Sequence, residues 1–222
     1  TYQHDYYLVH DAVWGLISWT TDESEERTAH YSIELRYSEY RAYKDSIEAE
    51  DRLFSTTQTV GEHKMRAADK PVFVTYQDPV IQKIATDFNA ITAGMPALER
   101  AQFVLNFVTK AVVYAYDGET TGIIEYYRFP YETLWDDTGD CEDTAFLYAT
   151  LMKAMGYDVV ILDYPTHVMV AVADVLGCTG YYYNVDGKKY YACETTGDAG
   201  YFEVGYLNPK YSSMKVNIIK IE

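Results

Sequence analysis

Basic residues are scarce in this sequence. Its 222 residues include 18 Lys and Arg against 34 Asp and Glu, which gives a formal net charge of −16. Nucleic acids and anionic membrane surfaces would be repelled by this charge at long range, so we exclude both as partners. A basic peptide substrate, a cation, or a need for solubility alone remains compatible with it.

Long apolar runs and cysteines are scarce as well. No stretch approaches the roughly 18 apolar residues of a membrane helix, so no membrane span is predicted. The three cysteines, Cys141, Cys178 and Cys193, are too few for a disulfide scaffold, and an odd number leaves at least one thiol unpaired. With 48% hydrophobic residues, the composition is that of one folded domain with at most a small appendage.

Tyrosine is abundant, with 24 residues that often stand as neighbours, such as Tyr6-Tyr7, Tyr126-Tyr127 and Tyr190-Tyr191. Tyrosine suits half-exposed strands and wet surfaces, which indicates an extracellular protein. Because the chain begins with Thr1 and not with Met, we expect a targeting or anchoring segment to have been removed. The predicted location is extracellular or on the cell surface.

Residues 1–78 are expected to form an accessory, β-containing region. Asp22–Glu26 is an acidic run that we expect to be solvated, and residues 48–68 give no clear signal. Residues 71–75 form a short extended run. Four apolar or aromatic residues alternate with polar ones and predict a half-buried strand: Tyr31, Ile33, Leu35 and Tyr37.

Residues 79–222 are expected to form the core, which begins with two helices. Asp78-Pro79 is a helix start, because Asp is a good N-cap and Pro fits the first helical position. Apolar residues recur behind it at helical spacing. Gly94–Pro96 interrupts this pattern, so a second helix is predicted to begin there.

A third helix and three strands follow in the predicted core. The helix begins at Cys141 and ends at Gly156, because apolar residues recur at helical spacing between them. Short β-branched runs then occupy residues 159–162, 168–173 and 189–195. His167 therefore begins the second strand, and Glu194 lies on the third.

Cys141, His167 and Glu194 form a candidate catalytic triad. A thiol at a helix N-terminus is favoured as thiolate by the helix dipole, and a nearby imidazolium adds to this effect. His167 and Glu194 can reach the thiol only if the strands pack against the helix N-terminus. Cys141 would then attack a carbonyl group, His167 would carry the proton, and Glu194 would orient the imidazole. The backbone N–H of Cys141 is one oxyanion donor, and the second is expected among Trp135, Tyr127 and Tyr131.

The sequence around these residues resembles the transglutaminase-like cysteine peptidase superfamily. It is similar to archaeal surface members and to bacterial periplasmic peptidases that clip large adhesins. The resemblance covers about residues 79 to 200. The segments that carry it are Asn106–Val108, Tyr114–Asp117, Pro130–Leu134, Gly139-Asp140-Cys141-Glu142-Asp143, Gly156-Tyr157, Thr166–Val172 and Tyr190–Thr196.

This resemblance implies an α+β, papain-like core with a Cys-His-acid triad. Many relatives carry Asp as the acid, whereas this chain offers Glu194; Asp163 is the rival, only four residues before His167. The adhesin-clipping relatives bind calcium through acids beside the nucleophile, and Asp140 and Glu142 match those positions. Calcium is therefore one alternative, and a helix cap without a metal is the other.

Cys178 and Cys193 have two alternative roles. Cys193 precedes Glu194 in an alternating strand, so it points to the opposite face. A Cys178–Cys193 disulfide would stabilise the strand that holds Glu194 in an oxidising compartment. Two unpaired thiols are the alternative.

Two function classes follow from the sequence. The first is a thiol enzyme that acts on an amide bond of a protein or peptide substrate through an acyl-thioester at Cys141, as a peptidase or as a transglutaminase that cross-links. A peptidase is favoured because the resemblance is closer to the peptidase members. The second is a non-catalytic cell-surface interaction module on the same fold. Retention of all three triad residues favours the enzyme.

Overall fold

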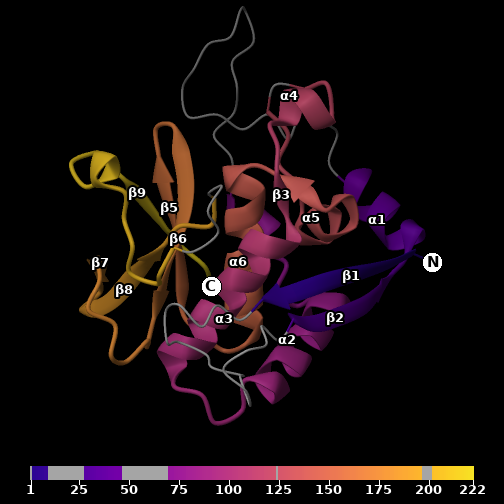
Figure 1. Ribbon diagram of the computed structural model, residues 1–222. Helices are drawn as coiled ribbons and strands as arrows, with labels where there is room; N and C mark the ends of the chain where they lie inside the picture. The colour runs from indigo at the N-terminus through magenta and orange to yellow at the C-terminus, as the bar shows by residue number, and fades with distance from the viewer. Residues whose placement is uncertain (1, 10–27, 47–69, 124, 197–201) are drawn as a thin grey trace, which may run out of the picture.

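The helix that begins at Cys141 lies at the centre of the molecule (Figure 1). The structure is a computed structural model that describes residues 2–9, 28–46, 70–123, 125–196 and 202–222. The predictions for Asp22–Glu26 and for residues 48–68 lie outside these residues. No helix in the described part of the chain is long and apolar enough to cross a membrane.

A five-stranded antiparallel sheet packs against one side of this helix, α6 (Cys141–Ala154). Its strand order is β7-β8-β6-β5-β9, and α6 contacts β5 and β6. The α+β class predicted from the sequence is confirmed. The strands are β5 (Val159–Tyr164), β6 (His167–Ala173), β7 (Tyr182–Val185), β8 (Lys188–Cys193) and β9 (Asn217–Lys220).

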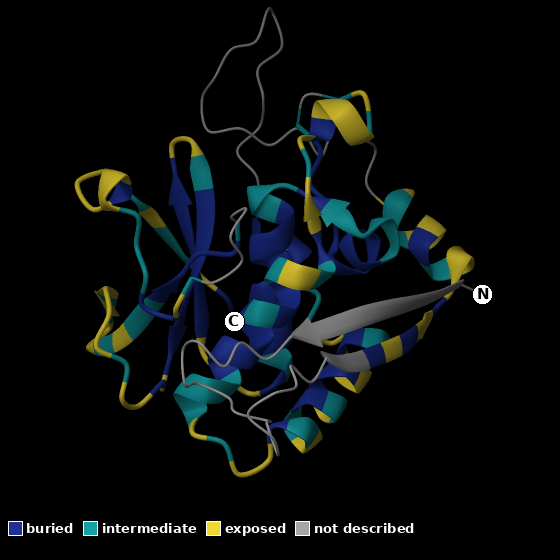
Figure 2. Cartoon of the chain, in the orientation of Figure 1, coloured by how far each residue is buried: buried dark blue, intermediate teal, exposed yellow. Residues whose placement is uncertain are grey.

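Helices cover the other side of α6. Three of them contact it: α2 (Pro79–Ile91), α3 (Ala97–Ala111) and α5 (Pro130–Asp136). As a result α6 is buried nearly all round, whereas an apolar stripe on one face was predicted (Figure 2). A short helix, α4 (Asp117–Thr120), and a two-stranded parallel sheet of β3 (Val113–Tyr114) and β4 (Thr138–Gly139) lead to its N-terminus.

The described N-terminal residues pack on these helices. β1 (Tyr2–Val9) pairs with β2 (Thr28–Leu35) and contacts α3, and α1 (Tyr37–Lys44) contacts α5. The predicted strand ends at Leu35, because Arg36 is the extended N-cap of α1; Tyr37 is therefore on a helix and exposed, which corrects the prediction. Residues of this region, including Tyr31 and Leu35, share one buried core with the rest. The boundary at residue 78 stays a prediction.

Local signals explain most other element ends. The Asp78 side chain accepts hydrogen bonds from the N–H groups of Val80 and Ile81, as expected of an N-cap. Gly156, with φ of 95°, follows the C-cap of α6 and ends this helix as predicted. The extended run predicted at residues 71–75 is wrong: a 3₁₀ turn spans Lys70–Phe73, and it buries Phe73 against the ring of Phe146.

The first turn of α6 is fixed by a buried guanidinium group. Arg128 is 1% exposed and donates through Nη1 to Asp117, at 2.7 Å, and to Asp143, at 2.6 Å. Its backbone N–H also donates to Asp143. Asp143 in turn accepts from the backbone N–H of Asp140, which closes a capping box at the start of α6. Arg128 thereby ties the segment before α5 to the helix start.

Gly139 is required by the same packing. A Cβ atom at this position would lie 2.6 Å from the Cβ atom of Asp143, closer than carbon atoms approach without a shift. The glycine therefore lets β4 pass directly over the first turn of α6, where Cys141 stands.

We expect Arg128→Met to lower the free energy of unfolding by about 3–5 kcal/mol, because it leaves two buried carboxylates without their cation. The loss should shrink at low pH, where Asp117 and Asp143 become protonated. Urea denaturation measures it. Arg41→Ala is the control, since it breaks an exposed pair with Asp45 that contributes about 0.5 kcal/mol. A loss for Arg128→Met as small as that of the control would contradict this account.

Candidate active site

Cys141 is the first residue of α6 and is half-buried. The Asp140 side chain caps the helix by accepting from the N–H of Glu142 at 3.2 Å. The Cys141 thiol therefore lies at the positive end of the helix dipole. Its Sγ atom donates a hydrogen bond to Glu142 Oε2 at 2.8 Å, whereas the sequence prediction paired it with His167.

The electrostatic surroundings of the thiol differ from the expectation of a thiolate. Burial raises the pKa of Cys141 well above its ordinary value, and the carboxylates of Glu142 and Asp140 raise it further. A hydrogen bond from the backbone N–H of Val168 lowers this pKa, because it stabilises the thiolate. Because Val168 directly follows His167, the thiol lies at the start of β6.

His167 and Glu194 form a close pair. His167 Nε2 lies 2.9 Å and 3.1 Å from the two carboxylate oxygens of Glu194, and both side chains are nearly buried. The backbone N–H and the hydroxyl group of Thr196 donate to the same carboxylate, at 3.0 and 2.7 Å. Glu194 is thus held in place by three groups, which are His167 Nε2 and the N–H and hydroxyl groups of Thr196.

Glu194 follows β8 and does not lie on it, which is a small correction to the prediction. Its neighbours face α6: Cys193 belongs to the main core, and Thr195 hydrogen-bonds Thr144 of α6 at 3.0 Å. The alternation of the chain turns Glu194 away from α6, as predicted for Cys193 and Glu194.

Asp163, the rival acid, has a different partner. It forms an ion pair with Lys70 at 3.4 Å, and both side chains are buried. Lys70 also donates to the hydroxyl group of Tyr127 at 3.3 Å. Asp163 therefore compensates a buried cation, while Glu194 is the acid beside His167.

Tyr211 was missed by the sequence analysis. Its buried ring stacks on the His167 imidazole, with centroids 4.9 Å apart and planes 9° from parallel. Tyr211 lies in a short 3₁₀ turn, Pro209–Tyr211, far from His167 in the sequence. No motif marks it, so only the fold reveals that the imidazole is fixed from its face by Tyr211 and from its edge by Glu194.

The three oxyanion candidates separate into two groups. Tyr127 is buried near the site, and Glu142 and Cys141 are among the groups that raise its pKa. The other two lie against α1: the Tyr131 hydroxyl accepts from the N–H of Arg36 at 2.7 Å, and Trp135 stacks on Tyr40. Tyr131 and Trp135 are therefore corrected to packing residues, because α5 presents them to α1.

Carboxylates surround the thiol. Ligand atoms of Asp140, Cys141 and Glu142 lie within 4.8 Å of one another, as do those of Asp117, Asp140 and Asp143. Burial and the neighbouring carboxylates raise the pKa of Asp140 to about 10. Hard oxygen ligands with uncompensated negative charge suit Ca²⁺. Arg128 already compensates Asp117 and Asp143, so Asp140 and Glu142 fit the cation best.

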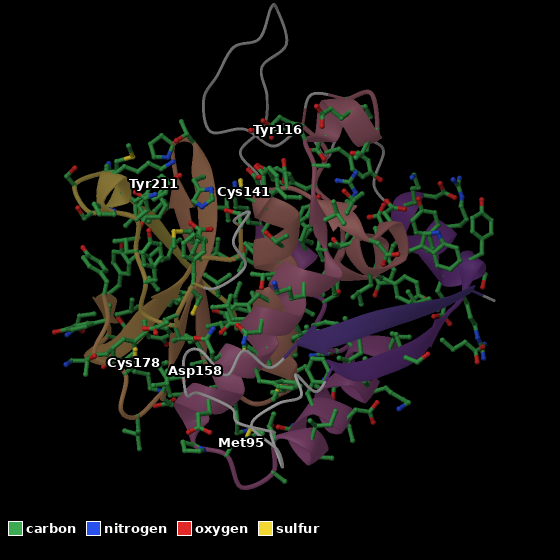
Figure 3. The ribbon with its side chains drawn as sticks, viewed as in Figure 1. Met95, Tyr116, Cys141, Asp158, Cys178 and Tyr211 are labelled. Atoms are coloured by element: carbon green, nitrogen blue, oxygen red, sulfur yellow. The ribbon has the colours of Figure 1, made fainter. Side chains whose placement is uncertain are left out.

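Cys178 and Cys193 are free thiols in the structure, so the predicted disulfide is not formed. Cys178 donates to the carbonyl group of Val204, and Cys193 is buried in the main core. Cys193 is the last residue of β8, and Cys178 lies in the loop between β6 and β7. Figure 3 shows Cys178 at the lower left, well away from Cys141 near the upper end of α6.

No protein-family model and no curated protein matches the chain. Among solved structures, it is similar to EGTA-treated LapG of Legionella pneumophila, with TM-score 0.42 and 15% identity over 64% of this chain and 84% of that chain. A second LapG structure from this organism has a TM-score of 0.38 and 16% identity, and the match covers 61% of this chain and 79% of that chain. A TGase has a TM-score of 0.38 and 13% identity, and the match covers 84% of this chain but 46% of the TGase chain. At TM-scores below 0.5, these likenesses carry no part of the functional argument, which rests on the site itself.

Proposed function

We propose that this protein is a thiol-dependent acyl-transfer enzyme that cleaves an amide bond of a protein or peptide substrate. One observation carries the proposal: the thiol at the start of α6 contacts the backbone next to His167, whose imidazole is held by Glu194. A nucleophile, a base and a group that orients the base are the parts that acyl transfer requires. The substrate is expected outside the cell or at its surface.

The reaction proceeds in two halves. The Cys141 sulfur attacks the substrate carbonyl carbon while His167 takes the thiol proton, and the carbonyl oxygen becomes an oxyanion. The backbone N–H of Cys141 and the Tyr127 hydroxyl are the proposed oxyanion donors. The C–N bond then breaks, and His167 returns the proton to the leaving amine. Water attacks the resulting thioester, with His167 as base, and releases the acid and the free thiol.

Glu194 and Tyr211 support this proton transfer. The Glu194 carboxylate stabilises the imidazolium that forms when His167 takes the proton, and Thr196 holds the carboxylate in place. Tyr211 restricts the imidazole to one plane. Neither group gives or takes a proton, so their effect is expected on the rate and not on the products.

We further propose that Asp140 and Glu142 hold calcium. When bound, the cation supplies positive charge that offsets the carboxylates beside the thiol. Glu142 also accepts the hydrogen bond of Cys141, so engagement of Glu142 elsewhere releases the thiol toward His167.

One observation favours a second candidate, a non-catalytic interaction module. The carboxylates raise the pKa of Cys141, which makes the thiol a weaker nucleophile without a cation. A module of this kind would bind a protein and leave its amide bonds intact.

Hydrolysis of fluorescein-labelled, heat-denatured casein tests the enzyme. We expect Cys141→Ala and His167→Ala to abolish hydrolysis, and Glu194→Gln to slow it about 100-fold, because the imidazolium loses its counter-charge. Asp174→Asn, on the exposed end of the sheet, is the control with a normal rate. Amine incorporation into casein, measured with dansylcadaverine, would show transglutaminase chemistry instead. Absence of both activities in calcium-loaded wild type would favour the interaction module.

Calcium removal has a predicted effect on stability. The pKa of Asp140 is raised to about 10 in the folded state, so at pH 7 folding must neutralise a carboxylate that is ionised in the unfolded chain. This proton uptake costs stability, and the cost disappears only below the unfolded pKa. Asp140→Asn keeps an N-cap without this charge, so in EDTA it should raise the free energy of unfolding by about 1 kcal/mol.

The same variant should lose the benefit of calcium. At a hundredfold excess of calcium over its dissociation constant, wild type should gain about 2.7 kcal/mol and Asp140→Asn almost none. Asp158→Asn, a surface carboxylate paired with Lys188, should respond like wild type. A wild-type protein whose unfolding curve is unchanged by calcium would remove the metal from the account.

A further inference from the structure

A strand edge that no other described strand covers lies beside the candidate nucleophile. β3 belongs to a two-stranded parallel sheet, and in the described part of the chain β4 is its sole partner. Tyr114 is opposite Gly139 in this sheet, two residues before Cys141. Edge strands present unpaired N–H and C=O groups that pair readily with another chain.

The hydrogen bonds of β3 define which of its backbone groups face outward. The N–H groups of Val113 and Ala115 donate to Asp137 and Gly139, at 2.9 and 3.1 Å. Because peptide groups alternate along a strand, the N–H and C=O groups of Tyr114 point away from β4. These two groups form the outer edge of the sheet.

The side chains around this edge are unusually exposed for apolar and aromatic residues. Val113 is 68%, Tyr114 40% and Tyr116 64% exposed. The rings of Tyr114 and Tyr116 contact each other edge-to-face, with centroids 5.6 Å apart. In Figure 3, Tyr116 and Cys141 both lie in the upper part of the molecule, and Figure 2 shows β3 as exposed. Cys141 and Asp140 both raise the pKa of Tyr114, so its phenol is near the thiol.

We propose that the outer edge of β3 binds an extended segment of the protein substrate as an added strand, hydrogen-bonded to the N–H and C=O groups of Tyr114. This inference rests on the proposed function, since it names the substrate class as unfolded or extended polypeptide. A strand added there lies about 10 Å, or two strand spacings, from β4, which leads to Cys141. An extended chain advances about 3.3 Å per residue, so it crosses this distance in about three residues. The paired residues are therefore about three positions from the bond that Cys141 attacks, and Tyr114 and Tyr116 contact their side chains.

The test compares reagents that alkylate the same thiol. Cys141 is treated with iodoacetamide, with an iodoacetyl tetrapeptide of alternating valine and alanine, and with the same tetrapeptide N-methylated at its amides. The measured quantity is the ratio of the tetrapeptide rate to the iodoacetamide rate, followed by mass spectrometry at Cys141. We expect a ratio of about 10 for wild type and a loss of about threefold or more on N-methylation, since one hydrogen bond is removed.

Variants at Tyr114 separate its backbone from its ring. Tyr114→Ala removes the ring and keeps the N–H group, while Tyr114→Pro removes both, and the outward N–H is not needed for the β4 ladder. The ratio for Tyr114→Pro should be about threefold or more below that for Tyr114→Ala. Tyr181→Ala, which removes a tyrosine that is 41% exposed just before β7 and outside the β3–β4 sheet, should keep the wild-type ratio.

Three results of the alkylation assay would overturn the proposal. They are a wild-type ratio near 1, a ratio indifferent to N-methylation, and equal ratios for the proline and alanine variants. A dimer that Tyr114→Pro converts to a monomer in light scattering would assign the edge to a second copy instead. If the proline variant does not fold, the N-methylated peptide on wild type still decides. The ratio of the two alkylation rates does not depend on catalytic turnover. If wild type does not hydrolyse casein but keeps the predicted ratio, the proposed enzyme activity is rejected and the strand-binding site is retained.

Discussion

The ion pairs of Arg128 with Asp143 and Asp117 are the constraint on which the site depends. The guanidinium group is almost fully buried, and removal of one partner would leave a buried charge uncompensated. Asp143 also closes the capping box of α6, so the same carboxylate that holds Arg128 fixes the orientation of the residues just before Cys141. The packing of β4 over this turn requires Gly139. The position of the thiol is therefore set by charge and backbone geometry together.

The chemistry of the site depends on a balance between charges of opposite sign. The helix dipole and the Val168 N–H group favour a thiolate, whereas burial and the carboxylates of Glu142 and Asp140 oppose it. Glu194 holds the edge of the His167 imidazole and Tyr211 holds its face, so the ring needs little reorientation before it takes the thiol proton. A cation held by the carboxylates would shift the balance toward the thiolate, which makes the proposed calcium a regulator of the nucleophile.

Local signals in the sequence predict much of the fold. Asp78 as an N-cap, Gly156 as a helix end and the β-branched runs after it act over a few residues, and the structure agrees with each. Errors arise where tertiary packing decides. Residues 70–73 form a 3₁₀ turn that brings the ring of Phe73 against Phe146. Tyr131 and Trp135 turn toward α1, and the sequence does not show that α1 packs beside them.

The same distinction applies to the site. Cys141, His167 and Glu194 could be selected from their residue types and from the elements on which they lie. Tyr211, Arg128 and Lys70 could not, because each acts through a contact between segments distant in the sequence. Buried ion pairs have no sequence periodicity, and a ring that stacks on an imidazole has no spacing rule.

The most direct test of the account is the rate at which iodoacetamide alkylates each cysteine of the calcium-loaded protein at pH 6. At this pH an ordinary thiol, with a pKa of about 8.5, is almost entirely protonated. The account predicts that Cys141 reacts much faster than Cys178 and Cys193, and that His167→Ala removes the advantage. A Cys141 rate equal to theirs, or one that His167→Ala leaves unchanged, would contradict the proposed catalytic pair.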